Sequence, residues 1–111
     1  MTNVADGTIS SSLSGCFTAL ITPFRDGLID EPALRALVQR QIAAGVSGLV
    51  PCGTTGEAPV LSVPEWDRVV AVVVETADRR IPVLAGTGSN NTATVIERTR
   101  RARARIHRCP R

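Results

Sequence analysis

Residues 48–57, with the sequence Gly-Leu-Val-Pro-Cys-Gly-Thr-Thr-Gly-Glu, decide the fold of this chain. The segment begins as a short apolar run, which predicts a strand, and it ends in a glycine-rich turn. A helix is expected soon after it, because Ser62 and Glu65 have the spacing of a capping box and Pro64 stands in the first turn. The segment therefore predicts a strand and a loop, followed by a helix over residues 63–77.

A similar unit precedes this segment. The apolar run 16–22 predicts a strand that is buried on both faces, and a turn is expected at residues 24–27. Asp30 is a good N-cap for the helix that follows, and Gly45 is expected to end that helix. The first unit therefore has the same order of elements as the second.

Another unit follows. The apolar run 81–85 predicts a third strand, which leads into the glycine-rich residues 86–88. Either Asn90 or Asn91 caps a third helix, which continues into the arginines of residues 98–105. The chain is thus expected to contain three consecutive βα units.

Three βα units predict an α/β fold with a parallel sheet and helices outside it. Three units cannot cover both faces of a sheet whose strands are apolar on both sides. A (β/α)₈ TIM barrel takes about 250 residues, and the chain has 111. The fourth and fifth strands of a small doubly wound sheet are missing. We therefore expect residues 15–104 to form the first three βα units of an incomplete TIM barrel, and residues 1–14 to form a flexible extension.

The composition argues against several classes of protein. The chain is 43% hydrophobic and 21% charged, which is typical of a globular domain. The longest apolar run, residues 69–74, is far shorter than the ~20 residues of a membrane-spanning helix, and the first residues lack the pattern of a secretory signal. Cys16, Cys52 and Cys109 are widely spaced and indicate neither a disulfide framework nor a zinc site. A cytoplasmic chain without membrane association or cofactor is expected.

The positive charge is concentrated at one end. All 13 basic residues are arginines, and residues 97–111 contain seven of them beside a single acidic residue, Glu97. Such a segment can bind phosphate groups, but it lacks the interleaved aromatic residues of a single-strand binder. A nucleic-acid partner is therefore not expected, and a small nucleic-acid-binding or interaction protein is the alternative from a different functional class.

Candidate functional residues follow the predicted strands, because α/β proteins gather such groups at the carboxyl ends of their strands. The three segments are residues 22–23, 53–57 and 86–91. Glycines let the backbone present N–H groups to an anion, and threonine hydroxyls donate to a carboxylate or pass a proton. Residues 53–57 are thus a candidate anion site, with a simple strand-to-helix turn as the alternative. For Glu57 we favour a structural role, accepting hydrogen bonds, over that of a general base.

Three segments resemble, in order and spacing, the dihydrodipicolinate synthase and N-acetylneuraminate lyase family: residues 15–24, 53–57 and 81–88. The lyase branch usually carries a serine at the position of Thr54, so the chain is more similar to the synthase branch. The resemblance implies a (β/α)₈ barrel, usually a homotetramer, in which a lysine forms a Schiff base with pyruvate. Condensation with aspartate semialdehyde then leads to diaminopimelate and lysine. A pyruvate-dependent aldolase or dehydratase with a sugar-acid substrate is the alternative within the family.

The resemblance also implies roles for residues of the turn. Thr55 would bind the pyruvate carboxylate through its hydroxyl and backbone N–H, together with Gly56. Thr54 would be the middle member of a Tyr-Thr-Tyr proton relay. The Schiff-base lysine and both tyrosines lie beyond the third helix in the family, and this chain contains neither residue type. Because imine formation needs an amine, the chain alone is expected to be inactive.

Two departures from the family pattern carry expectations of their own. After Ala104 the family continues with a turn and a fourth apolar strand, whereas residues 105–111 form an atypical basic tail, which we interpret as a truncation or a frameshift. In members that lysine inhibits, polar residues line the effector site. Here Val63, Trp66 and Thr94 take such places, while Asn90 is kept. Weak or absent inhibition by lysine is therefore expected.

Overall fold

The centre of the fold is a small parallel sheet. The computed structural model describes residues 13–107, and in it strand β1 (Phe17–Ala19) pairs in parallel with β4 (Gly48–Val50). Residues 81–85 extend the sheet on the other side of β4 through a parallel bridge between Leu49 and Val83. The three predicted strands therefore lie side by side in parallel, with the run 48–52 in the middle.

The third apolar run forms only this bridge and no full strand. The amide of Leu49 donates to the carbonyl of Pro82 at 3.0 Å, and the amide of Leu84 donates to the carbonyl of Leu49 at 2.9 Å. Pro82 has no N–H of its own. Residues 81–85 therefore pair with β4, but only over a short stretch.

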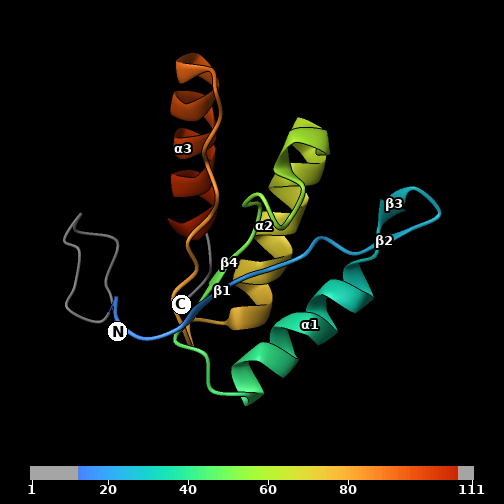
Figure 1. Cartoon of the computed structure of the whole chain (residues 1–111), viewed down its shortest axis with the longest axis vertical. Coiled ribbons are helices and arrows are strands. Elements are labelled where there is room, and N and C mark those ends of the chain that lie inside the picture. Colours follow the sequence, from blue (N-terminus) through green and yellow to red (C-terminus); the bar gives the residue numbers. More distant parts are fainter. Residues whose placement is uncertain (1–12, 108–111) are drawn as a thin grey trace.

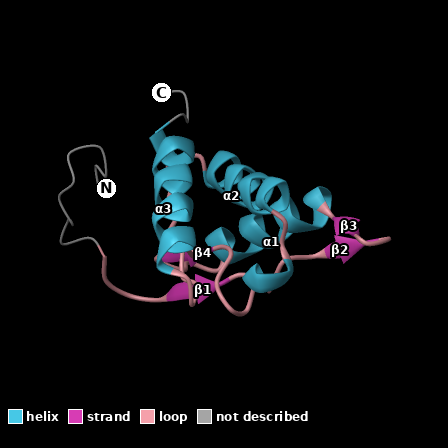
Figure 2. Ribbon diagram, turned by 90° about the horizontal axis from the view of Figure 1, so that it is seen from above, coloured by secondary structure: helices cyan, strands magenta, loops and turns pink. Residues whose placement is uncertain are grey.

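Three helices follow these segments, and all of them lie on the same side of the sheet (Figure 2). They are α1 (Glu31–Ala43), α2 (Val63–Ala77) and α3 (Thr92–His107). Figure 1 shows α2 between the other two helices, and it packs against both. None of the helices in residues 13–107 combines the length and the apolar character that are needed to cross a membrane.

The helix starts are those expected from the capping residues. The Asp30 carboxylate accepts a hydrogen bond from the amide of Ala33 at 3.0 Å. Ser62 and Glu65 form both hydrogen bonds of the capping box, at 3.3 Å and 2.8 Å. Of the two candidate caps for the third helix, Asn91 is the one used, because its side-chain oxygen accepts from the amide of Ala93 at 2.9 Å. The three predicted helices are confirmed.

The turn predicted at residues 24–27 is the loop of a small hairpin. Strands β2 (Phe24–Arg25) and β3 (Leu28–Ile29) pair in an antiparallel manner. Asp26 and Gly27 both have positive φ, 52° and 76°, as a two-residue type I′ turn requires. The hairpin projects from the rest of the chain (Figure 1).

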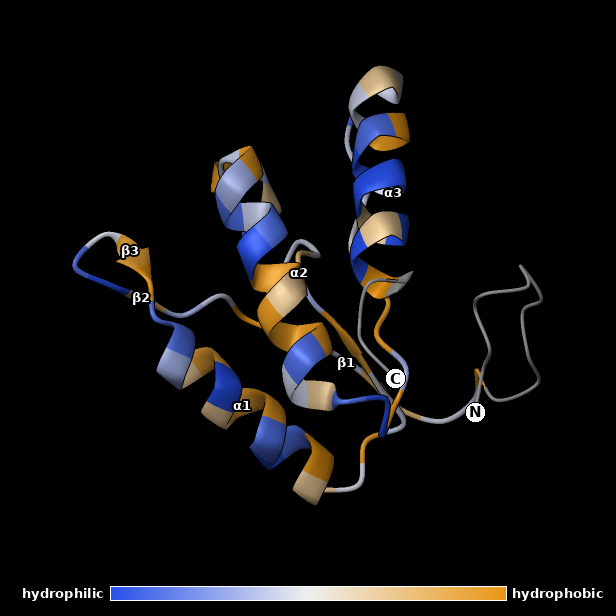
Figure 3. Cartoon of the chain, turned by 180° about the vertical axis from the view of Figure 1, so that it is seen from behind, coloured by the Kyte–Doolittle hydropathy of each residue, from blue (hydrophilic) through white to orange (hydrophobic). Residues whose placement is uncertain are grey.

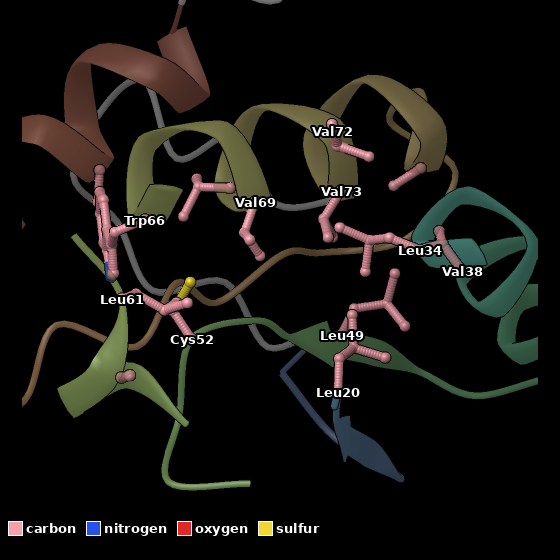
Figure 4. Close-up of a cluster of buried hydrophobic side chains, with 14 residues drawn as sticks. Leu20, Leu34, Val38, Leu49, Cys52, Leu61, Trp66, Val69, Val72 and Val73 are labelled. Atoms are coloured by element: carbon pink, nitrogen blue, oxygen red, sulfur yellow. The ribbon is translucent and has the colours of Figure 1, made fainter. Parts of the chain in front are cut away.

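The hydrophobic core lies between the sheet and the helices (Figure 4). The valine-rich middle of α2 is the most hydrophobic stretch of helix, whereas α3 is mostly hydrophilic (Figure 3). Among residues 13–107, the core consists of 14 buried side chains, namely Leu20, Leu34, Val38, Leu49, Cys52, Ala58, Leu61, Trp66, Val69, Val70, Val72, Val73, Ala77 and Ala102.

The expectation that the first strand is buried on both faces is wrong for this chain. Leu20 faces the helices and is only 3% exposed, but the neighbouring Ile21 is 55% exposed. Leu84, in the third run, is 42% exposed. The helices of the described part cover one face only (Figure 2), so alternate residues of the apolar runs remain open to solvent.

The two predicted end segments lie largely outside the described residues. Of the extension proposed for residues 1–14, only Leu13 and Ser14 are described. Helix α3 continues through Ala104 without a break, and residues 105–107 belong to it. Residues 108–111 of the proposed basic tail are not described.

Candidate functional site

Residues 53–57 form a tight turn directly after β4. The amide of Gly56 donates to the carbonyl of Gly53 at 3.1 Å, and the amide of Glu57 donates to the carbonyl of Thr54 at 3.0 Å. Cys52, directly before the turn, and Glu57, its last residue, both have φ of 58°. This left-handed conformation is unfavourable for residues with a Cβ, so contacts with the surroundings must hold the turn in place.

Two neighbouring segments supply these contacts. On the side of β1, the Thr22 hydroxyl donates to the carbonyl of Gly56 at 2.7 Å. On the side of the third run, the amide of Gly86 donates to the carbonyl of Pro51 at 2.8 Å. The carboxyl ends of the three parallel segments therefore meet around the turn, as the sequence predicts. Sequence reasoning placed Thr22 and Gly86 in candidate loops but assigned them no role.

Thr54 and Thr55 lie at the exposed tip of this turn. Within residues 13–107, neither of their amides donates to a backbone carbonyl. Two neighbouring N–H groups and two hydroxyls are thus available to a ligand from solvent. Such a group of donors suits a carboxylate.

Gly56 is buried beneath the two threonines. A Cβ at this position would lie 3.0 Å from the carbonyl oxygen of Leu20 and 3.2 Å from the amide nitrogen of Cys52. The turn can therefore approach β1 this closely only with glycine at position 56. The amide of Gly56 is already bonded within the turn, so this residue contributes shape to the site.

Cys52 directly precedes the turn, and its thiol lies among core side chains (Figure 4). Burial raises the pKa of this thiol to about 12, and the charge of Arg98 opposes the rise only in part. A neutral, buried thiol is a poor nucleophile. Cys52 is therefore a packing residue of the site.

Within residues 13–107, Glu57 does not act as the hydrogen-bond acceptor that the sequence predicts. Its side chain is exposed and makes no capping hydrogen bond to the short 3₁₀ helix η2 (Ala58–Val60) that follows. Trp66 is a packing residue of the core. It is 2% exposed, and its indole Nε1 donates to the carbonyl of Gly86 at 3.1 Å.

A groove of about 350 Å³ lies between the start of α2 and α3. The three residues compared above with effector-site positions, Val63, Trp66 and Thr94, all line it. The basic side chains in it are Arg98 and Arg101. Arg98 donates to the carbonyl of Gly88 at 2.9 Å, and Arg101 forms ion pairs with acidic side chains of α2 and α3. Both guanidinium groups are thus already engaged within the chain.

Residues 12–107 match the profile of the Dihydrodipicolinate synthetase family. The chain belongs to this family. It is 62% identical over 91 residues to a 4-hydroxy-tetrahydrodipicolinate synthase from Thermomicrobium roseum, and 57% identical over 89 residues to one from Parvibaculum lavamentivorans. These alignments cover 82% and 80% of this chain, but only 30% and 31% of the relatives. The chain thus spans about three-tenths of the length of the curated synthases that it matches.

The solved structures agree with the family assignment. The 4-hydroxy-tetrahydrodipicolinate synthase from Methylacidiphilum fumariolicum SolV superimposes with a TM-score of 0.82 at 44% identity, over 84% of this chain and 31% of that chain. The fold is therefore α/β and consists of three βα units of a TIM barrel whose sheet is not closed.

Proposed function

We propose that this chain is the part of a 4-hydroxy-tetrahydrodipicolinate synthase that binds the carboxylate of pyruvate. One observation carries the proposal: within the described residues 13–107, the exposed Thr54 and Thr55 present amides that donate to no backbone carbonyl, together with two hydroxyls, at the carboxyl ends of parallel strands. Thr55 would donate its hydroxyl and amide N–H to the carboxylate, and Gly56 would close the turn directly beneath it. Thr54 would be the middle member of a proton relay.

The reaction also needs groups that these 111 residues do not contain. Pyruvate reacts with aspartate semialdehyde only after a lysine amine has formed an imine with the keto group, and the chain has no lysine and no tyrosine. We therefore infer that the lysine and the outer members of the relay come from the remainder of the barrel. The chain of residues 1–111 alone is inactive under this proposal.

The resemblance to the family further implies a cytoplasmic homotetramer for the complete enzyme. Within the chain we propose the extent of the barrel part as residues 15–104, with residues 1–14 as an extension and 105–111 as an atypical tail. The intact mass of the protein produced from its own gene tests the interpretation of the tail. A mass near 11.8 kDa supports a truncated product, whereas a much larger mass with a lysine trapped by borohydride and pyruvate indicates a frameshift in the sequence.

The sharpest test of the proposed function is a chimera. The segment of the Thermomicrobium roseum synthase that aligns with this chain over 91 residues is replaced by the residues of this chain. The complete barrel then supplies the lysine, and we expect the chimera to convert pyruvate and aspartate semialdehyde. A folded chimera that does not form an imine with pyruvate contradicts the proposal.

In this chimera, Thr55→Val is expected to lower kcat/KM for pyruvate by roughly 10- to 100-fold, because a hydrogen bond to a charged carboxylate is lost. Thr55→Ser keeps the hydroxyl and is the matched control, with activity close to that of the parent chimera. Steady-state kinetics with varied pyruvate measure the effect. Equal kcat/KM values for the valine and serine variants would refute the role of the hydroxyl.

The chimera is also expected to be insensitive to lysine at sub-millimolar concentrations. Val63 and Trp66 of the groove between α2 and α3 have neither a carboxylate for the lysine ammonium nor a cation for its carboxylate. The charged side chains of the groove are already engaged within the chain, because Glu97 pairs with Arg101 and Arg98 donates to the carbonyl of Gly88. The initial rate is measured over a series of lysine concentrations, beside the parent enzyme. Inhibition by sub-millimolar lysine in the chimera would show this prediction to be wrong.

A further inference from the structure

Thr22 is one of two polar side chains that are buried in the described part of the chain, with 4% of its surface exposed. It follows β1 and lies on the same side of the chain as the buried Leu20. Its hydroxyl donates to the carbonyl of Gly56 at 2.7 Å, although the two residues are 34 positions apart in the sequence. This hydrogen bond directly joins the end of β1 to the turn that carries Thr54 and Thr55.

The hydrogen bond fixes one particular peptide plane. The carbonyl of Gly56 belongs to the peptide that leads into Glu57, whose φ of 58° is left-handed. A residue with a Cβ relaxes from this conformation unless its neighbours hold it. The Thr22 hydroxyl is hydrogen-bonded to the carbonyl of Gly56. This hydrogen bond opposes rotation of the peptide between Gly56 and Glu57, and it therefore opposes a change in the backbone conformation of the turn.

The packing around Gly56 limits which side chains can stand at position 22. A Cβ on Gly56 would lie 3.3 Å from the Thr22 hydroxyl oxygen, so the two residues approach closely and there is no room for a substituent between them. A valine at position 22 would place a methyl group against a buried carbonyl and leave that carbonyl without its partner. A serine would keep the donor.

We propose that Thr22 is a positioning residue, which holds the turn of residues 53–57 in the conformation that presents the amides of Thr54 and Thr55 to a carboxylate. It does not touch the ligand itself. The proposal rests on the proposed function for its ligand, but the state of the turn is a property of the chain without any ligand. The two ideas can therefore fail separately.

The test uses the chain of residues 1–111 with uniform ¹⁵N labelling. Backbone amide spectra are recorded without ligand and during titration with sodium pyruvate, for the wild type and for Thr22→Val and Thr22→Ser. Thr76→Val is the matched control, because Thr76 is the other buried polar residue and its hydroxyl donates to the carbonyl of Val72, within α2.

In the absence of pyruvate, Thr22→Val is expected to shift the amide resonances of residues 54–57 and to accelerate their hydrogen exchange. Thr22→Ser and Thr76→Val leave these resonances unchanged. With pyruvate, the Kd reported by the amides of Thr54 and Thr55 rises about five-fold in Thr22→Val, which corresponds to the loss of one hydrogen bond. The Thr76→Val variant is expected to be less stable than the wild type but to bind pyruvate with an unchanged Kd. This result would show that a loss of stability alone does not weaken binding.

Each other outcome has a distinct meaning. If Thr22→Val leaves both the turn resonances and the Kd unchanged, the proposal is overturned. If the wild-type amides do not respond to pyruvate, kcat/KM for pyruvate is measured instead in the chimera, where Thr22→Val is expected to lower it about five-fold. An unchanged kcat/KM there overturns the role of Thr22, whereas a folded chimera that forms no imine contradicts the proposed function. Thr22→Ala, which removes the hydroxyl without placing a methyl group against the carbonyl, takes the place of the valine variant if that variant does not fold.

Discussion

Gly86→Ala is expected to destabilise the chain by about 3 kcal/mol, a large fraction of the stability of a small domain. A Cβ at this position would lie 2.2 Å from the carbonyl oxygen of Cys52 and 2.8 Å from the amide nitrogen of Gly53. Both are backbone atoms, so no side chain can move aside. The third run must separate from β4 instead, and Gly86 then loses its hydrogen bonds with Pro51 and Trp66.

The matched control for this substitution is Gly88→Ala, two residues further along the chain. A Cβ on Gly88 would meet nothing within 4 Å. We therefore expect a change within about 0.5 kcal/mol, as for other surface substitutions. Urea denaturation followed by circular dichroism measures both variants at the same protein concentration. Equal midpoints for the two variants would contradict the close packing of Gly86 against the turn.

The sequence predicted best those features that neighbouring residues determine. The three helices begin at caps that need only a polar side chain and an amide two or three positions later, as with Asp30, Ser62 and Asn91. The order of the units follows from the alternation of apolar runs and helices. The hairpin at residues 24–29 was predicted only as a turn, because two-residue strands are too short to show a period of two.

The features that the sequence did not predict depend on distant parts of the chain. Ile21 and Leu84 are as apolar as a buried strand requires, but their exposure depends on which elements cover the second face of the sheet. The hydrogen bond between Thr22 and Gly56 joins residues that no local pattern relates. Glu57 was expected to accept hydrogen bonds, but a left-handed backbone conformation that sequence does not reveal places its side chain in solvent.

In the candidate site, too, the sequence predicts some features from neighbouring residues and leaves others open. Glycine and threonine in residues 53–57 predict a turn at the end of a buried strand, because glycine allows the backbone conformations of a turn. They leave open whether the turn binds an anion or only connects the strand to the helix. The proposed roles of Thr54 and Thr55 in particular come from the family resemblance. Composition alone does not distinguish the residue that binds a carboxylate from its neighbour.

Trp66→Ala is expected to have the largest effect of any single substitution considered, a loss of about 3–5 kcal/mol in the free energy of unfolding. Trp66 is among the largest fully buried side chains, and it lies beside Leu61 and Cys52 in the core (Figure 4). Alanine would leave a cavity under the turn and would also remove the hydrogen bond from the indole to the carbonyl of Gly86. Thermal and urea denaturation, followed by far-ultraviolet circular dichroism, measure the loss.

Two further variants divide this effect into its parts. Trp66→Phe keeps most of the buried ring but not the N–H donor, so it should cost about 1–2 kcal/mol, mainly through the unpaired carbonyl of Gly86. Val63→Ala, three residues earlier in the same helix, removes a side chain that is 55% exposed and should change the stability by less than about 1 kcal/mol. Because Trp66 joins α2 to the third run, its loss should also increase hydrogen exchange at Leu84 and Gly86. Protection at these two amides equal to that in the wild type would show that the core below the turn does not hold the third run in the sheet.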